Sequence, residues 1–129
     1  MNKDMTNKAK VLIVDDEVNI RLTLSKILAL KGYIVSTAEN GLSAFESVKK
    51  EDFDVILMDV KMPIMNGLEA LIHIRQIRPA ANIIFMSAFS IEDIIKDILK
   101  GHSYTMIKKP LNVDEVINVI EAIKKEKQL

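Results

Sequence analysis

The sequence lacks cysteine and tryptophan altogether, and it has no net charge, because its 18 basic side chains are balanced by 18 acidic ones. The absence of cysteine excludes disulfide frameworks and thiolate metal sites. The charge balance argues against a general binder of nucleic acid or of anionic membranes, which needs a basic excess. Every apolar run in the sequence is much shorter than the roughly 18 residues that a membrane-spanning helix needs. We therefore expect no direct nucleic-acid binding and no membrane insertion.

A chain of 129 residues suits a single domain. A domain of this size buries about two thirds of the surface that its unfolded chain exposes, which is enough for a stable core without disulfides or structural metals. We expect residues 1–8 to form a flexible tail, residues 9–126 to form the domain, and residues 127–129 to be a helix end or the start of a linker. The first residues lack the apolar stretch of a signal peptide, so we expect a cytoplasmic location.

Short apolar runs rich in β-branched residues alternate with longer segments of helical period. The predicted strands are residues 11–15, 33–37, 54–58, 83–87 and 104–107. The predicted helices are residues 18–31, 42–50, 68–77, 91–100 and 113–125. Several strands are apolar on consecutive residues, which is typical of strands buried on both faces of a parallel sheet. The alternation predicts an α/β fold, a doubly wound (βα)5 sandwich with helices on both faces of the sheet.

Local signals mark several of the helix ends. Gly32 follows the first predicted helix and would stop it as a C-terminal cap. Ser90 with Asp93, and Asn112 with Glu115, have the spacing of an N-terminal capping box. These signals predict where the first, fourth and fifth helices end or begin.

Polar side chains stand at the ends of four predicted strands. They are Asp15 and Asp16, Asp59, Ser87 and Lys109. In doubly wound sheets, sites form beyond the carboxyl ends of the strands. Converging carboxylates repel one another unless a cation lies among them, and their oxygens suit Mg²⁺. A lysine and a hydroxyl can bind phosphoryl oxygens, and a carboxylate can attack phosphorus, so this pattern favours phosphoryl transfer.

Five pieces of the sequence together resemble the receiver domain of two-component response regulators. They are Asp15-Asp16, Asp59, Met62-Pro63-Ile64-Met65-Asn66-Gly67, Ser87-Ala88 and Lys109-Pro110. Each piece alone is common, but their order and intervals on a (βα)5 pattern are specific. The resemblance covers residues 9–126 and implies the strand order 2-1-3-4-5. It also implies a phospho-switch rather than an enzyme, a protein that catalyses only its own phosphotransfer and slow self-dephosphorylation.

The resemblance implies a role for each residue of this site. Asp59 would be the phosphoacceptor, and the donor would be a sensor histidine kinase or a histidine phosphotransfer protein. Asp16, Asp59 and the backbone carbonyl of Lys61 would bind Mg²⁺ or Mn²⁺. Asp15 would help through a water molecule, and Lys109 would pair with the phosphoryl group.

The resemblance also implies how the signal leaves the site. Ser87 would move to the phosphoryl group after transfer, and Pro110 would form a cis-peptide turn that aims Lys109 inward. Residues 91–100, the fifth strand and the last helix would form the signalling face toward an output domain or a downstream protein. The chain would be a monomer, or a dimer on phosphorylation.

One switch position departs from the family pattern. Three residues before Lys109 the family often has an aromatic residue that turns inward when the hydroxyl residue, here Ser87, moves; this chain has Met106. Methionine is flexible enough to fill the same gap, but it gives no two-position aromatic switch. Tyr104 should point to the same face of the strand as Met106, and we expect that it does not take over the role.

Other interpretations of the same residues compete with this one. An aspartyl-phosphate phosphatase of the haloacid dehalogenase type needs a second aspartate where this chain has Lys61. A flavodoxin-like cofactor binder needs a phosphate-binding loop after the first strand, where Asp15-Asp16-Glu17 repels phosphate. A degenerate receiver used only as a scaffold is disfavoured because every acceptor-site residue is present. The acidic run alone would otherwise be a helix N-terminal cap.

Overall fold

The computed structural model describes residues 9–88 and 92–128 of the chain. Within these residues one parallel sheet forms, in the order β2-β1-β3-β4-β5. Its strands are β1 (Lys10–Val14), β2 (Ile34–Ala38), β3 (Val55–Asp59), β4 (Ile83–Ser87) and β5 (Thr105–Lys108). This order confirms the predicted doubly wound sandwich. The order reverses at β1, so the carboxyl ends of β1 and β3 border the place where such folds form their sites.

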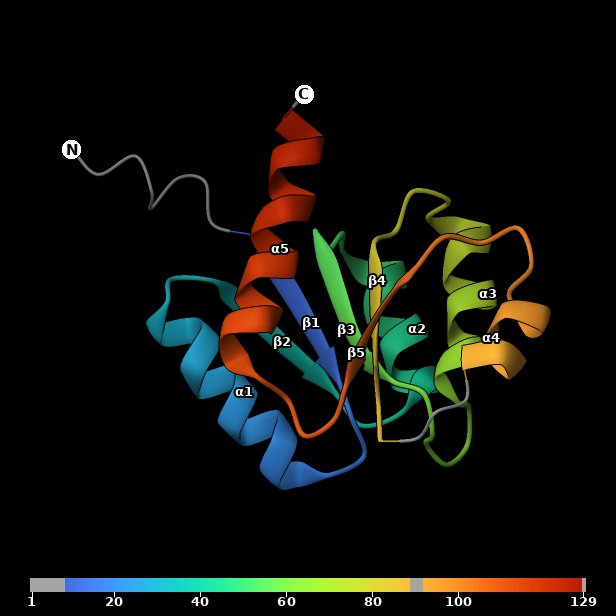
Figure 1. The fold of residues 1–129 in the computed structure, drawn as a ribbon, viewed down its shortest axis with the longest axis horizontal. Coiled ribbons are helices and arrows are strands. Elements are labelled where there is room, and N and C mark those ends of the chain that lie inside the picture. The colour runs from blue at the N-terminus through green and yellow to red at the C-terminus, as the bar shows by residue number, and fades with distance from the viewer. Residues whose placement is uncertain (1–8, 89–91, 129) are drawn as a thin grey trace.

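Helices cover both faces of the sheet (Figure 1). They are α1 (Val18–Leu30), α2 (Gly41–Lys50), α3 (Gly67–Ile77), α4 (Glu92–Ile98) and α5 (Val113–Gln128). The helices α1 and α5 lie on one face, and α2, α3 and α4 lie on the other. Among the described helices, none combines the length and the apolar composition that a membrane crossing requires.

Two apolar clusters, one on each face, hold these layers together. Leu28 of α1 and Ile120 of α5 belong to one cluster, and Leu71 of α3 and Ile95 of α4 belong to the other. All four side chains are fully buried, and burying such a side chain contributes about 1.5–3 kcal/mol. The strands β3 and β4 are buried along their whole length because helices cover both of their faces.

Gly32 ends the first helix in the way that the sequence predicts. Its φ of 96° lies in the left-handed region, and its N–H donates to the carbonyl of Ala29 at 3.0 Å. The N–H of Tyr33 donates to the carbonyl of Leu28 at 3.1 Å. These two bonds satisfy carbonyls that the end of the helix would otherwise leave without a donor, and glycine adopts the required φ without strain.

Asparagine side chains cap the starts of α2, α3 and α5. The Oδ1 atom of Asn112 accepts the N–H of Glu115 at 3.1 Å, which confirms the predicted start of α5. Asn66 and Glu69 form a reciprocal capping box at the start of α3. The predicted capping residue Ser90 lies outside the described residues.

Several predicted element boundaries differ from the observed ones by one or a few residues. The fifth strand begins at Thr105 rather than at Tyr104, and the last helix continues to Gln128, beyond residue 125. The fourth helix ends at Ile98 rather than at residue 100. Gly101 lies in a turn just beyond it with a φ of 89°, so this glycine ends the helix earlier than the apolar period suggests.

Candidate functional site

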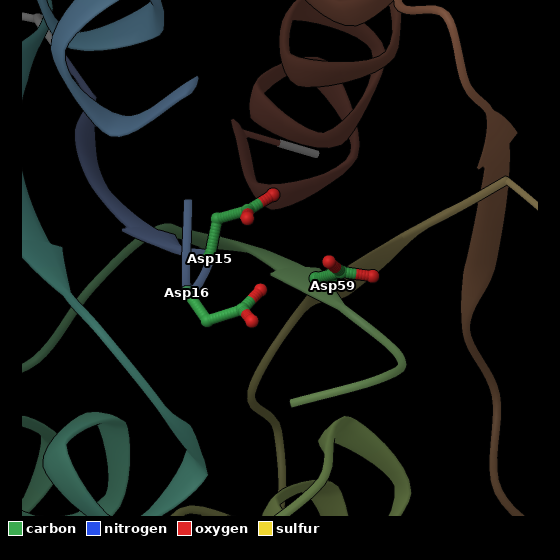
Figure 2. Close-up of side chains that lie close together, drawn as sticks. All are labelled: Asp15, Asp16 and Asp59. Carbon is green, nitrogen blue, oxygen red and sulfur yellow. The ribbon is translucent and has the colours of Figure 1, made fainter. Parts of the chain in front are cut away.

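Three carboxylates meet at the carboxyl edge of the sheet. Asp59 is the last residue of β3, and Asp15 and Asp16 directly follow β1. Figure 2 shows the three side chains close together beyond these two neighbouring strand ends. Each offers one oxygen, and these oxygens all lie within 4.8 Å of one another. The structure thus brings together the three acidic residues that the sequence places at the strand ends.

Asp15 is completely buried, and each of its polar groups has a partner. Its Oδ1 atom accepts the backbone N–H of Glu17 at 2.9 Å, and its Oδ2 atom accepts Nζ of Lys109 at 2.9 Å. Its own N–H donates to the carbonyl of Ala38 at 3.2 Å. Its carbonyl accepts Nη1 of Arg21 at 2.7 Å. A buried carboxylate is stable in the fold only when it is satisfied in this way.

Lys109 joins the carboxylates of the two strands. Its Nζ atom lies 2.9 Å from Oδ2 of Asp15 and 3.1 Å from Oδ2 of Asp59. Its backbone N–H donates to the carbonyl of Ser87 at 2.8 Å, which fixes the lysine to the end of β4. The peptide bond between Lys109 and Pro110 is cis, as the resemblance implies.

Burial and charge shift the protonation equilibria of this group in opposite directions. Burial raises the pKa of Asp59, the hydrogen bond and charge of Lys109 lower it, and the charge of Asp15 raises it again, so that the net direction is upward. The N–H of Lys61, 3.3 Å from Oδ1 of Asp59, lowers the pKa by a smaller amount. Burial lowers the pKa of Lys109, but its bonds to Asp15 and Asp59 outweigh burial and raise it, so the lysine stays charged.

A cleft of about 1030 Å³ opens above these groups. The residues that line it include Asp16, Asp59, Lys61, Ser87 and Lys109. Asp16 is exposed, whereas Ser87 is only 4% exposed. Asp15 does not line the cleft and lies beneath it. A molecule in the cleft therefore reaches Asp59 and Asp16 directly, but it does not reach Asp15.

The loop after Asp59 is held against the start of α2. The N–H of Gly41 donates to the carbonyl of Met65 at 2.9 Å. A Cβ atom on Gly41 would lie 2.4 Å from that carbonyl oxygen, so a larger residue would push the loop away. Within the loop, Ile64 has a φ of 71°, and the N–H of Met65 donates to the carbonyl of Pro63 at 2.7 Å. A β-branched residue in this left-handed region is strained.

Met106, the predicted switch residue, and Tyr104, which was expected not to take over its role, do not line the cleft. Met106 and Tyr104 are half-buried, and both pack against the cluster on the α3 and α4 face, which confirms that they share a face. The ring of Tyr104 lies edge-on to the ring of Phe85, with 5.6 Å between the ring centroids. Met106 stands opposite Phe85 in the register of β4 and β5.

One residue at the site was not predicted from the sequence: Arg21, whose guanidinium binds the backbone carbonyl of Asp15. No sequence pattern marks a side chain that binds a backbone carbonyl, because the direction of that carbonyl is a property of the fold. The cap at the start of α3 was not predicted either. There the spacing of Asn66 and Glu69 was a usable signal, since it is that of a capping box.

The donor set suits a hard divalent cation. Three carboxylates offer oxygens within 4.8 Å of one another, and Asp16 and Asp59 face an open cleft that also admits water. Carboxylate and water oxygens are the ligands that Mg²⁺ and Mn²⁺ prefer, whereas softer metals prefer nitrogen or sulfur. Beside this set, Asp59 and Lys109 form a carboxylate and ammonium pair that can attack phosphorus and bind an anion.

Comparisons with known proteins agree with this geometry. The sequence matches the response regulator receiver domain over residues 11–121. It is 37% identical to the chemotaxis protein CheY of Bacillus subtilis (strain 168) over 112 residues, which cover 86% of this chain and 93% of that protein. It is 35% identical to the sporulation initiation phosphotransferase F of the same organism over 112 residues, which cover 87% of this chain and 90% of that protein.

A solved structure extends the comparison to three dimensions. The response regulator protein TrrA from Thermotoga maritima, in complex with Mg(2+)-BeF, superposes with a TM-score of 0.77 at 32% identity. The match covers 89% of this chain and 98% of that one.

Proposed function

Because this chain belongs to the family of response regulator receiver domains, we propose that Asp59 is its phosphoacceptor. The donor is a phosphohistidine of a sensor kinase or of a phosphotransfer protein. The observation that carries this proposal is the setting of Asp59, which is only 8% exposed, lines an open cleft, and lies 3.1 Å from the ammonium group of Lys109. A phosphodonor can therefore reach the carboxylate of Asp59 through the cleft, while the ammonium group of Lys109 holds it in place.

In the transfer step, a carboxylate oxygen of Asp59 forms a bond to phosphorus while the bond from phosphorus to the histidine nitrogen breaks. The electron pair of the broken bond stays on the histidine ring, and the product is an acyl phosphate. Asp59 must be ionised to attack, and the charge of Lys109 favours the ionised form.

Asp16, Asp59 and the backbone carbonyl of Lys61 hold Mg²⁺ or Mn²⁺, and Asp15 takes part through a water molecule. The spacing of the carboxylate oxygens supports this set, as does the Mg(2+)-BeF complex of TrrA. Two observations support a contact between Asp15 and the cation through water rather than a direct one. Asp15 is fully buried, and hydrogen bonds already occupy both of its carboxylate oxygens. The cation supplies positive charge where negative charge gathers during transfer.

After transfer, the hydroxyl of Ser87 donates to a phosphoryl oxygen, and Lys109 pairs with the phosphoryl group. Both residues line the cleft that Asp59 faces, which supports these roles. Met106 stands on the strand next to that of Ser87 and is flexible enough to fill the space that a moving hydroxyl residue leaves. Water hydrolyses the acyl phosphate slowly, so the protein resets itself and acts as a signalling phosphoacceptor rather than as an enzyme.

The signal leaves through α4, β5 and α5, toward an output domain or a downstream protein. A groove of about 780 Å³ beside β5 and α5 supports this face as a contact surface, with Thr105 of the strand and Asn118 of the helix in its lining. The chain acts as a monomer, or as a dimer on phosphorylation, and residues 9–126 form the domain.

The test of the acceptor assignment is phosphorylation by a small donor. The wild-type protein, incubated with acetyl phosphate and Mg²⁺, should gain one phosphoryl group in an intact-mass measurement, and chelation of the cation should prevent the gain. Asp59→Asn should not gain it, whereas Asp97→Asn, which removes an exposed carboxylate on α4, should behave as wild type. Equal labelling of Asp59→Asn and the wild-type protein would show that the acceptor lies elsewhere.

A further inference from the structure

The two peptide groups that flank Asp16 are each fixed by a hydrogen bond. The peptide before it carries the carbonyl of Asp15, which accepts Nη1 of Arg21 at 2.7 Å. The peptide after it carries the N–H of Glu17, which donates to Oδ1 of Asp15 at 2.9 Å. The orientation of these two planes sets the backbone dihedral angles of Asp16, and those angles set the direction in which its carboxylate leaves the chain.

Arg21 is well placed to fix the first of these planes. It lies in α1, and its own N–H donates to the carbonyl of Glu17 at 3.2 Å. Arg21 therefore holds the segment from Asp15 to Glu17 in two ways, with its backbone N–H and with its guanidinium. Its side chain is half-buried, so the hydrogen bond is partly shielded from water.

The start of α1 has few other constraints. Glu17 occupies the N-cap position but makes no side-chain capping bond, and the first turn holds no acidic residue. The helices α2, α3 and α5, by contrast, begin with an asparagine whose side chain accepts a backbone N–H. Without a cap of that kind, the segment from Asp15 to Glu17 depends on the bonds to Asp15 and to Arg21 for its conformation.

We propose that Arg21 is a positioning residue for the metal ligand Asp16, and that it acts by holding the carbonyl of Asp15. The proposal rests on the proposed function in one respect, the assignment of Asp16 as a ligand of Mg²⁺. The guanidinium does not touch the cation or the phosphoryl group. It fixes the peptide plane from which Asp16 reaches the cleft.

Removal of the Arg21 guanidinium distinguishes a role through charge from a role through positioning, because the two roles predict opposite changes in the affinity for Mg²⁺. If Arg21 acted only through its charge, its loss would make the acidic site more negative and Mg²⁺ would bind more tightly. If it acts by positioning, its loss frees the carbonyl of Asp15 and Mg²⁺ binds more weakly. Loss of a group that orients a metal ligand typically weakens metal binding by about 10–100-fold, and we expect a change near the lower end of this range.

The experiment compares Mg²⁺ binding by wild-type protein, Arg21→Met and Lys26→Met, using isothermal titration with MgCl₂ alone. Methionine keeps an unbranched apolar stem and removes the guanidinium. Lys26 is an exposed cation on the same helix, so Lys26→Met is the matched control for the loss of charge. Arg21→Lys, which keeps a cationic donor, should recover part of the affinity. The melting temperature of each variant without Mg²⁺ establishes that it is folded.

We expect the dissociation constant of Arg21→Met to rise about tenfold and that of Lys26→Met to stay close to the wild-type value. Amide hydrogen exchange at Glu17 should also be faster in metal-free Arg21→Met, because its peptide plane has lost a neighbouring constraint. If Arg21→Met does not fold, Arg21→Gln is judged by the same criterion. Binding by the variant as tight as that of wild type, or tighter, would overturn the positioning role alone. No Mg²⁺ binding by the wild-type protein would overturn the proposed metal site and this role with it.

Discussion

Lys109 is the cation that neutralises two carboxylates of the site, and its replacement by methionine tests the electrostatics directly. Asp15 is fully buried and Asp59 nearly so, and the ammonium group lies 2.9 Å and 3.1 Å from their oxygens. Lys109→Met keeps a side chain of similar length and leaves two negative charges close together without their shared partner. We expect the folded state to be destabilised.

The expected loss follows from what a broken buried ion pair costs. Removing one partner of a buried pair destabilises a protein by about 3–5 kcal/mol. The lower end applies here, because Asp15 keeps its bond from the N–H of Glu17 and Asp59 faces the open cleft. A loss of about 3 kcal/mol corresponds to a fall in melting temperature of about 10 °C for a domain of this size.

The pH dependence has a definite sign. The bonds that raise the pKa of Lys109 in the folded protein stabilise the fold at pH 7, and that stability is lost only as the pH rises through the folded pKa. In Lys109→Met, the ionised carboxylate of Asp59 destabilises the fold, and because burial raises the pKa of this group, it regains its proton as the pH falls. The difference between variant and wild type should therefore shrink as the pH approaches about 4.

The assay is urea denaturation followed by far-ultraviolet circular dichroism, at pH 7 and near pH 4, with a chelator present. Lys50→Met, which removes an exposed lysine at the end of α2, is the control for the loss of a positive charge elsewhere. The double variant Lys109→Met, Asp59→Asn should recover part of the lost stability, because one of the two opposed charges is gone. Unchanged stability of Lys109→Met at pH 7 would show that the ammonium group of Lys109 contributes no net stability to the fold.

Further predictions concern the neighbours of this pair. Asp59→Asn should leave the metal-free melting temperature unchanged or raise it, because burial raises the pKa of Asp59 and its ionised form is therefore less stable in the fold than in the unfolded chain; a clear fall would contradict this. Ile64→Asn should raise the free energy of unfolding, measured by urea denaturation, by about 1 kcal/mol, because asparagine tolerates a φ of 71° better and the isoleucine is 77% exposed. The fluorescence of Tyr104 should barely respond to beryllofluoride, since its ring is packed against Phe85; a large response, absent in Tyr104→Phe, would show that Tyr104 moves.

Much of the site could be predicted from the sequence because this fold places its functional residues at the carboxyl ends of its strands. Parallel strands end at a common edge, so residues that follow Val14 and Met58 had to be neighbours once the strand order was known. The residue types at that edge, carboxylates and a lysine, then indicated the chemistry. The register of β1 and β3 pairs Val14 with Met58, which places Asp15 beside Asp59.

Other features depend on atomic directions that a sequence does not encode. The sequence placed Lys109 opposite the carboxylates, but its simultaneous contact with Asp15 and Asp59 depends on the turn before Pro110. Arg21 reads as an ordinary basic residue of an amphipathic helix, because its partner is a backbone carbonyl. Element ends were shifted for a related reason, since caps and turns are set by single hydrogen bonds rather than by apolar period.

Chemical trapping of the acyl phosphate identifies the residue that carries the phosphoryl group, which we propose is Asp59. Borohydride reduces an acyl phosphate of aspartate to homoserine and leaves free carboxylates unchanged. After phosphorylation with acetyl phosphate and Mg²⁺, tandem mass spectrometry of the reduced protein should find homoserine in place of Asp59 and nowhere else. Homoserine in place of Asp15 or Asp16, with Asp59 intact, would show that Asp59 is not the phosphoacceptor.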